Sequence, residues 1–304
     1  ICDAHPDYAS TQWAEKQNLP LVKVQHHIAH AYAVMAEKNV ELPVFAVIWD
    51  GTGFGLDETV WGGEFFIISE DKVERWGHFR TFPLPGGDKA VREPRRTAIG
   101  MLYELYGEEV FDFIEKELSF LRRAFTDTEW ASLGVMLRKG INSPRTSSAG
   151  RIFDGISAVL NLHQTCSYEA QSAMALESLA RRCNTTDDDS INCIGNLFTV
   201  EERNNKVVID WRGVVEYAIA GIRECKDVRA IAKQFHWALA DLVRRCAEIV
   251  GIKNVILNGG CFQNSLLLGY TNELLKDKFN VYFAQEVPPN DGGISLGQVN
   301  YALS

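Results

Sequence analysis

The sequence lacks several patterns that would assign a common function directly. Its seven cysteines include no Cys-x-x-Cys pair and form an odd set, which argues against a zinc ribbon and against a disulfide framework. Neither Gly-x-x-x-x-Gly-Lys nor Gly-x-Gly-x-x-Gly occurs, so P-loop nucleotidases and dinucleotide-dependent dehydrogenases are disfavoured. His-Glu-x-x-His is absent too, which disfavours a zincin-type protease.

Positive charge is scarce as well. The formal net charge is -9, and no basic stripe interleaves with aromatic residues, so we expect no nucleic-acid partner. No apolar run reaches the roughly 18 residues that span a bilayer, and no signal peptide precedes the fold. We therefore expect a cytoplasmic protein without a membrane partner. The 304 residues suffice for one large or two modest domains.

Hydrophobic patterning predicts an α/β protein in which strands and helices alternate. Helices are expected at 27–38, 92–107, 110–139, 151–162, 168–182, 227–250, 264–276 and 292–302. Strands are expected at 21–24, 44–49, 60–68, 197–200, 207–210, 255–257 and 281–283. The strand–helix–strand–helix order at the end of the chain predicts a mostly parallel sheet.

The stretch from 140 to 148 is rich in turn formers, and we place a lobe boundary there. Residues 1–145 would form an N-terminal lobe, whose start looks incomplete because 1–8 reads like the end of a strand entering a turn. Residues 146–304 would form a C-terminal lobe. Glycine-bearing turns in both halves suggest a two-lobed fold of the actin/sugar-kinase/Hsp70 type, with a nucleotide in the crevice between the lobes.

Three of the seven histidines lie within five positions, at His26, His27 and His30. On a helix, residues i and i+4 share one face about one turn apart, so His26 and His30 can direct two imidazoles at one cation. The alternative is that the pair lies on the surface or in satisfied core positions. Two histidines with one or two carboxylates suit iron, zinc or manganese. We expect a divalent metal ion, and iron and zinc are the preferred candidates.

Three glycine-bearing turns are candidates for nucleotide contact. The first, 50–55, lies between the strands of the predicted hairpin, where backbone N–H groups can face an anion. The second, 147–154, opens a helix. The third, 258–264, follows a buried strand and precedes a helix, which is a standard way to bring backbone against a nucleotide. Each turn alone commonly serves only to reverse the chain.

Asp291 lies at the N-terminal edge of the last predicted helix. An aspartate at this position is typical of an N-cap. A carboxylate that follows a strand end and faces a nucleotide crevice can equally complete a metal set with His26 and His30. Both interpretations stay open on the residues alone.

The motifs taken together are far more specific than any one of them. They are Cys-Asp-x-His-Pro-Asp-Tyr at 2–8, His-His-x-Ala-His at 26–30, Asp-Gly-x-Gly-x-Gly at 50–55, Trp-Gly-Gly-Glu at 61–64, Leu-Pro-Gly-Gly-Asp at 84–88, Ser-Ser-Ala-Gly-Arg-x-Phe-Asp at 147–154, Tyr-Glu-Ala-Gln at 168–171, Gly-Gly-x-x-x-Asn at 259–264 and Asn-Asp-Gly-Gly-x-Ser-Leu-Gly-Gln at 290–298. Through nearly its whole length, the chain resembles the C-terminal carbamoyltransferase domain of HypF, the [NiFe]-hydrogenase maturation protein. That domain is similar to the TsaD fold.

The resemblance implies a set of site residues. The catalytic metal would be surrounded by His26, His30, Asp50 and Asp291. The remaining assignments concern a nucleotide, the ATP/AMP moiety of a carbamoyl-adenylate. Its phosphate would lie near Gly51, Thr52 and Gly53, its ribose near Asp154 and Glu169, and the rest of it near Gly259, Gly260 and Asn264; Gly150 is also expected to contact the nucleotide.

The resemblance also implies an activity. The domain would receive carbamoyl-adenylate, transfer the carbamoyl group to the C-terminal cysteine of HypE for cyanide-ligand synthesis, and release AMP. A YrdC-like domain of full-length HypF would supply the adenylate, so HypE and that domain are the expected partners. Two alternatives remain open: an O-carbamoyltransferase of the antibiotic-biosynthesis type, and a nucleotide-binding domain without turnover.

Overall fold

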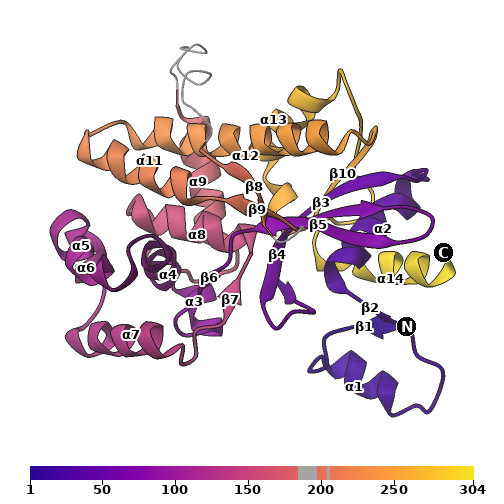
Figure 1. Ribbon diagram of the computed structural model, residues 1–304, viewed down its shortest axis with the longest axis horizontal. Coiled ribbons are helices and arrows are strands. Elements are labelled where there is room, and N and C mark those ends of the chain that lie inside the picture. Colours follow the sequence, from indigo (N-terminus) through magenta and orange to yellow (C-terminus); the bar gives the residue numbers. More distant parts are fainter. Residues whose placement is uncertain (184–196, 204–205) are drawn as a thin grey trace.

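The computed structural model describes residues 1–183, 197–203 and 206–304, and a mixed β-sheet forms its centre (Figure 1). Along this sheet the strands follow the order β11-β10-β3-β4-β5-β9-β8. Their bounds are Asn280–Phe283, Asn254–Asn258, Val44–Phe54, Val60–Ile68, Val73–Phe79, Lys206–Asp210 and Thr199–Arg203. Two short strands, β6 (Phe82–Pro83) and β7 (Arg145–Thr146), pair beside β4, and β1 (Cys2–Asp3) pairs with β2 (Lys23–Val24) in a separate two-stranded sheet.

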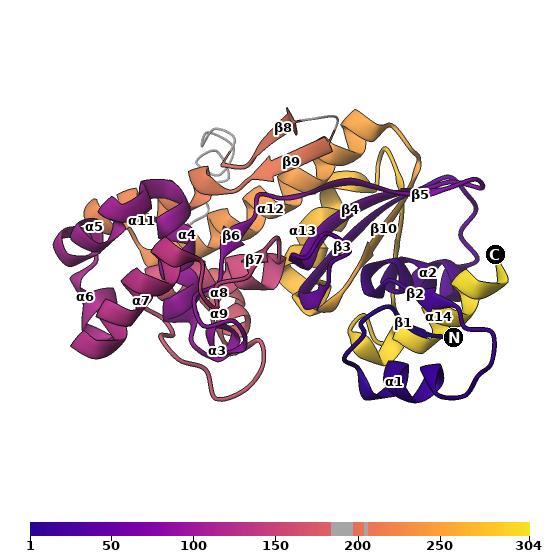
Figure 2. The same ribbon diagram turned by 60° about the horizontal axis from the view of Figure 1, so that its bottom comes forward.

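Helices cover both faces of the central strands. In the turned view, α2 (His26–Lys38) and α14 (Ile294–Leu303) lie below them, and α12 (Val228–Val250) and α13 (Ser265–Leu275) lie above (Figure 2). Most of the other helices lie toward the end of the molecule opposite α2 and α14, and α1 lies beside the two-stranded sheet of β1 and β2. They are α1 (Ala9–Glu15), α3 (Asp88–Arg92), α4 (Pro94–Tyr106), α5 (Val110–Glu117), α6 (Ser119–Arg123), α7 (Asp127–Lys139), α8 (Ala149–Val159), α9 (Gln171–Arg181) and α11 (Arg212–Arg223). Among the described residues, no helix is long and apolar enough to cross a bilayer.

Strand β3 is buried on both faces, and this explains its continuous apolar sequence. Side chains alternate across a strand, so successive residues enter different cores. Phe45, Val47 and Trp49 pack in the larger core, which includes apolar residues of α12 and α13. Val44 and Ile48 pack in a smaller core, which includes apolar residues of α2. The register of β3 therefore determines whether each residue toward its C-terminal end faces α2 or faces α12 and α13.

The structure confirms most of the predicted elements. The pattern correctly placed the hairpin of β3 and β4 and the long helix α12. It also predicted the order of the last four elements, which is β10, α13, β11 and α14. The predicted hairpin at 197–200 and 207–210 is the antiparallel pair β8 and β9.

Three details differ from the prediction. The predicted helix at 110–139 is divided into α5, α6 and α7, because the backbone leaves the helical conformation at Leu118 and a capping box of Thr126 and Glu129 starts a new helix. The sheet is mixed, since β3, β4 and β5 pair antiparallel. The glycine segment after Asp50 continues β3 to Phe54, with a register shift against β4, so the chain reverses only after it.

The lobe boundary near residue 145 stays a prediction. Strands from both sides of it share the central sheet, because β5 pairs with β9 and β3 pairs with β10. The segment predicted as a linker is also anchored: Ser147 and Ser148 are fully buried beside β4 and β3.

Gly259 makes the close approach of β10 to β3 possible. Its φ is +98°, and a Cβ atom there would lie 2.3 Å from the carbonyl oxygen of Trp49. We expect Gly259→Ala to lower the free energy of unfolding by at least about 1–3 kcal/mol, measured by urea denaturation.

Gly269→Ala is the matched control, because Gly269 lies in α13 with no atom near its would-be Cβ. That substitution should be neutral or stabilising by up to about 1 kcal/mol. Equal destabilisation by the two variants would contradict the role given to Gly259.

Candidate metal centre

Helix α2 presents His26 and His30 on one buried face, as their i, i+4 spacing predicts. The helix begins sharply because the side-chain oxygen of Gln25 accepts a hydrogen bond from the backbone N–H of Ile28. It ends at Asn39, which adopts the left-handed conformation. Both imidazoles therefore project from the first turns of a well-capped helix.

The register of β3 places Asp50 against these histidines. Asp50 follows Val44 and Ile48 in the alternation and so faces the α2 side of the sheet. Its Oδ1 accepts hydrogen bonds from the N–H groups of Gly51, at 2.8 Å, and Gly260, at 3.3 Å. Oδ2 is left to face the histidines.

Asp291 arrives from the last part of the chain. Helix α14 packs against α2 so closely that a Cβ on Gly297 would lie 1.8 Å from the carbonyl oxygen of Ala29. The carboxylate of Glu37 on α2 accepts hydrogen bonds from three backbone N–H groups at 285–287. The helix contact and the Glu37 anchor hold the segment that carries Asp291 beside the histidines.

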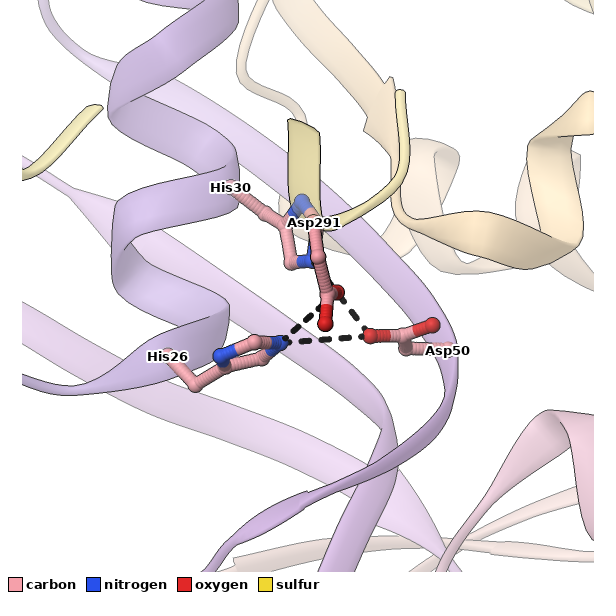
Figure 3. Close-up of side chains that lie close together, drawn as sticks. All are labelled: His26, His30, Asp50 and Asp291. Carbon is pink, nitrogen blue, oxygen red and sulfur yellow. Dashed lines mark ion pairs between the residues drawn. The ribbon is translucent and has the colours of Figure 1, made fainter. Parts of the chain in front are cut away.

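The four side chains meet at one point (Figure 3). The Nε2 atoms of His26 and His30 lie 3.4 and 3.3 Å from Asp50 Oδ2. They lie 3.4 and 3.9 Å from Asp291 Oδ1. The four potential ligand atoms all lie within 4.8 Å of one another, which is close enough to share one ion.

The donor set fits a divalent metal. Among the described residues, both Nε2 atoms are buried without a hydrogen-bond partner, which is costly unless another group satisfies them. Two imidazoles and two carboxylates suit iron, zinc or manganese, as the sequence indicated.

The electrostatics of the cluster also favour a cation. Burial disfavours a charged ring at His26, but the neighbouring carboxylates of Asp291, Asp3 and Asp50 outweigh burial and raise its pKa to about 12. Burial alone would raise the pKa of Asp50, yet His26 and His30 hold it well below its ordinary value. The carboxylates therefore create a strongly negative potential at the histidine ring.

The third histidine, His27, has a structural environment. Its ring is fully buried, burial lowers its pKa to about 3, and its Nδ1 lies 3.1 Å from Gln25 Nε2. A Cβ on Gly53 would lie 2.4 Å from this ring. Packing against neutral His27 thus accounts for glycine at position 53.

Two of the glycine turns converge on Asp50. A Cβ on Gly150 would lie 2.9 Å from the Cα of Gly51, and a Cβ on Gly260 would lie 2.9 Å from Asp50 Oδ1. The hydroxyl of Ser148 donates to the carbonyl oxygens of Asp50 and Gly51. The turns therefore meet at the metal centre, and the same contacts explain why glycine is needed there.

Thr52 is exposed and lies farther along β3. Together with Gly53, it lines a pocket of about 610 Å³ that His5, Tyr8 and Arg92 also border. One side of the predicted phosphate-binding segment therefore borders this pocket.

The remaining nucleotide candidates lie on separate elements. Asp154 is buried on α8, where it pairs with Arg151 at 3.1 Å and burial raises its pKa to about 6. Glu169 is exposed ahead of α9. Asn264 caps α13 through a hydrogen bond from the N–H of Leu267, and its Nδ2 lies 2.9 Å from His236 Nε2. None of these contacts tests a nucleotide role, so those assignments stay predictions.

The capping contacts decide against the interpretation of Asp291 as an N-cap. The side chain that caps the short turn at 291–293 is Asn290, not Asp291, so the carboxylate of Asp291 is free to face the histidines. His236 is buried, and its two ring nitrogens contact the carbonyl oxygen of Ala232 and the side-chain amide of Asn264, which is a structural environment.

Residue-level reasoning missed two polar groups beside the centre. Asp3 Oδ2 lies 3.2 Å from His26 Nδ1. Arg151 is buried in the first turn of α8, with its Nε and Nη1 lacking partners among the described residues. Both belong to motifs quoted above, but nothing in their spacing indicated that Asp3 approaches His26 or that Arg151 lies near Gly51.

Comparison with known proteins shows the family of the chain. Residues 46–298 match a family model described as the carbamoyltransferase, Kae1-like domain, second subdomain, and residues 1–37 match the HypF Kae1-like domain. The chain belongs to the HypF carbamoyltransferase family. The predicted resemblance is confirmed.

Curated HypF proteins align over almost the whole chain. Carbamoyltransferase HypF of Synechocystis is 37% identical over 310 aligned positions, which cover 98% of this chain and 39% of that protein. A HypF homolog of Cupriavidus necator is 35% identical and is covered to 75% of its length, with 97% of this chain aligned. The chain thus spans about two fifths of the Synechocystis HypF.

Solved HypF structures have the same fold. T. kodakarensis HypF superposes with a TM-score of 0.84 at 31% identity, covering 99% of this chain and 39% of that one. A full-length HypF in a phosphate- and nucleotide-bound form gives 0.81 at 32% identity, covering 99% of this chain and 46% of that one. The predicted two-lobed α/β fold class is confirmed by these matches.

The metal assignment can be tested directly. We expect His26→Ala and His30→Ala to weaken Zn²⁺ binding so far that only a small fraction of the chain keeps metal after dialysis, because each removes one of two nitrogen ligands. Metal content after dialysis against Zn²⁺, measured by atomic emission, is the readout.

His163→Ala is the control, since His163 lies outside the cluster. Its metal content should equal that of the wild type, and all three variants should keep their circular dichroism spectra. Full Zn²⁺ occupancy in a folded His26→Ala protein would contradict a metal centre at this position.

Proposed function

We propose that this chain is the domain that transfers a carbamoyl group from carbamoyl-adenylate to the C-terminal cysteine thiolate of HypE. The observation that carries the proposal is the convergence of His26, His30, Asp50 and Asp291 in a chain of the HypF carbamoyltransferase family. The nucleotide reported in the bound form of a related HypF supports an adenylate ligand. We propose a cytoplasmic location for the reaction.

The transfer consists of one bond exchange. The sulfur of HypE attacks the carbamoyl carbon, the bond between that carbon and the phosphate oxygen breaks, and AMP leaves with the electron pair. A divalent metal held by His26, His30, Asp50 and Asp291 would supply Lewis-acid stabilisation of the developing charge. The protein's own contribution is to hold these ligands in place before substrate arrives.

The nucleotide would occupy the region where the turns meet. We assign the phosphate to the backbone at Gly51, Thr52 and Gly53, and we assign Gly150 to the nucleotide site without a more specific contact. We assign the ribose to Asp154 and Glu169, and the rest of the nucleotide to Gly259, Gly260 and Asn264. The support for the phosphate assignment is that the 50–55 segment borders both the metal centre and the open pocket.

The adenylate would come from a YrdC-like domain of the full-length protein, which activates carbamoyl phosphate with ATP. Carbamoyl-adenylate hydrolyses readily if exposed to water, so its source and this site should act together. We therefore propose HypE and the YrdC-like domain as the two partners of this chain.

The decisive experiment mixes the metal-loaded chain with carbamoyl-adenylate and HypE, then measures the intact mass of HypE. We expect one carbamoyl group per HypE, and no gain after metal removal with a chelator. A HypE variant with its terminal cysteine replaced by serine is the matched control and should stay unmodified.

Two other experimental outcomes would contradict the proposal and favour a different function. Unmodified HypE together with turnover on a hydroxylated metabolite would support an O-carbamoyltransferase. Nucleotide binding without turnover on either acceptor would support a binding domain without catalytic activity.

The acceptor sulfur should belong to HypE and not to this chain. Cys261 is the cysteine placed beside Asp50, but burial and the neighbouring carboxylate raise the pKa of its thiol well above the ordinary value. We expect Cys261→Ala to transfer carbamoyl to HypE at the wild-type rate, measured by the same mass assay. A folded Cys261→Ala variant without activity, combined with a carbamoyl adduct on wild-type Cys261, would contradict this expectation.

A further inference from the structure

We propose that Asp3 is a positioning residue that fixes the ring of His26 in its metal-binding tautomer. This inference rests on the metal centre of the proposed function. The carboxylate of Asp3 contacts the ring nitrogen opposite the one that faces Asp50 and Asp291. Asp3 is a neighbour of a metal ligand and does not itself reach the ion position.

The tautomer follows from hydrogen-bond chemistry. Asp3 Oδ2 lies 3.2 Å from His26 Nδ1, and an ionised carboxylate can only accept a hydrogen bond. The proton of a neutral His26 ring must therefore be on Nδ1, which leaves the lone pair of Nε2 directed at Asp50 and Asp291. A carboxylate behind a metal-binding histidine also increases the basicity of the ligand nitrogen.

The local fold holds Asp3 for this contact. Strand β1 pairs in parallel with β2, and Asp3 lies opposite Val24, two residues before His26. Its Oδ1 accepts a hydrogen bond from the N–H of His5 at 2.7 Å, and its carbonyl oxygen accepts one from the hydroxyl of Thr11 at 3.0 Å. With Asp3 only 5% exposed, one carboxylate oxygen is committed to the turn and the other to His26.

The second histidine has no equivalent neighbour. Among the described residues, His30 Nδ1 is buried without a hydrogen-bond partner. His26 is therefore the ligand whose orientation the fold fixes by a hydrogen bond. An effect of Asp3 on metal affinity should act through His26 alone.

Asp3→Asn is the informative substitution. The amide has nearly the same shape, but it is neutral and can turn its NH₂ group toward Nδ1, which would favour the tautomer with a proton on Nε2. We expect the affinity for Zn²⁺ to fall about 10–100-fold, as is usual for such neighbours of metal ligands. Competition with a chromophoric chelator measures this change, with circular dichroism as the check on folding.

Two controls separate orientation of the ligand from general loosening of the segment. Asp7→Asn neutralises an exposed carboxylate in the same turn region and should leave Zn²⁺ affinity unchanged. Thr11→Val removes the hydrogen bond to the main chain of Asp3 but leaves its carboxylate, so it should lower thermal stability without weakening Zn²⁺ binding. A loss of affinity in Thr11→Val as large as that in Asp3→Asn would overturn the proposal.

A double-variant cycle provides the sharpest test. In a His26→Ala background, Asp3→Asn should cause no further loss of residual Zn²⁺ affinity. A further tenfold loss, or a single Asp3→Asn variant that binds Zn²⁺ as tightly as the wild type, would refute the role of Asp3. A wild-type chain that binds Zn²⁺ but does not carbamoylate HypE would contradict the proposed function alone.

Discussion

The clamped carboxylate of Asp50 is the contact on which the candidate site depends. One oxygen accepts hydrogen bonds from the N–H groups of Gly51 and Gly260, and the other faces the two histidines. These donors come from β3 and from the turn after β10, so the clamp joins adjacent strands of the sheet. A charged group held by preformed dipoles needs little rearrangement when a cation or a substrate arrives.

Close backbone approach brings the other ligands to this point. Gly297 allows α14 to touch the main chain of α2, and Gly259 allows the turn after β10 to touch β3. Three ligands, His26, His30 and Asp50, are buried, whereas the side chain of Asp291 is 75% exposed. The centre therefore combines a rigid buried set with one ligand that is accessible from solvent.

Much of the fold followed from local patterns. The i, i+4 histidines, the apolar strand β3 and the closing strand–helix order all have periodicities that a sequence displays directly. The break between α5 and α7 was also readable, because Thr126 and Glu129 form a capping-box pattern within the predicted helix. The assignment of Asp50 to a metal site followed only from family resemblance, since the glycines after it were interpreted as a loop and hid the continued alternation of β3. Asp3 could not be found at all, because its approach to His26 depends on the pairing of two two-residue strands.

The burial of β3 on both faces also limits how this family can vary in length. Loss or gain of a single residue between Val44 and Asp50 would reverse the alternation and turn the carboxylate of Asp50 toward the α12 side of the sheet. If the change lies directly after Val44, it would also turn Phe45, Val47 and Trp49 toward the α2 side and so exchange residues between the two cores. A point substitution along this strand changes one side chain, whereas a one-codon insertion or deletion changes the face of several side chains at once.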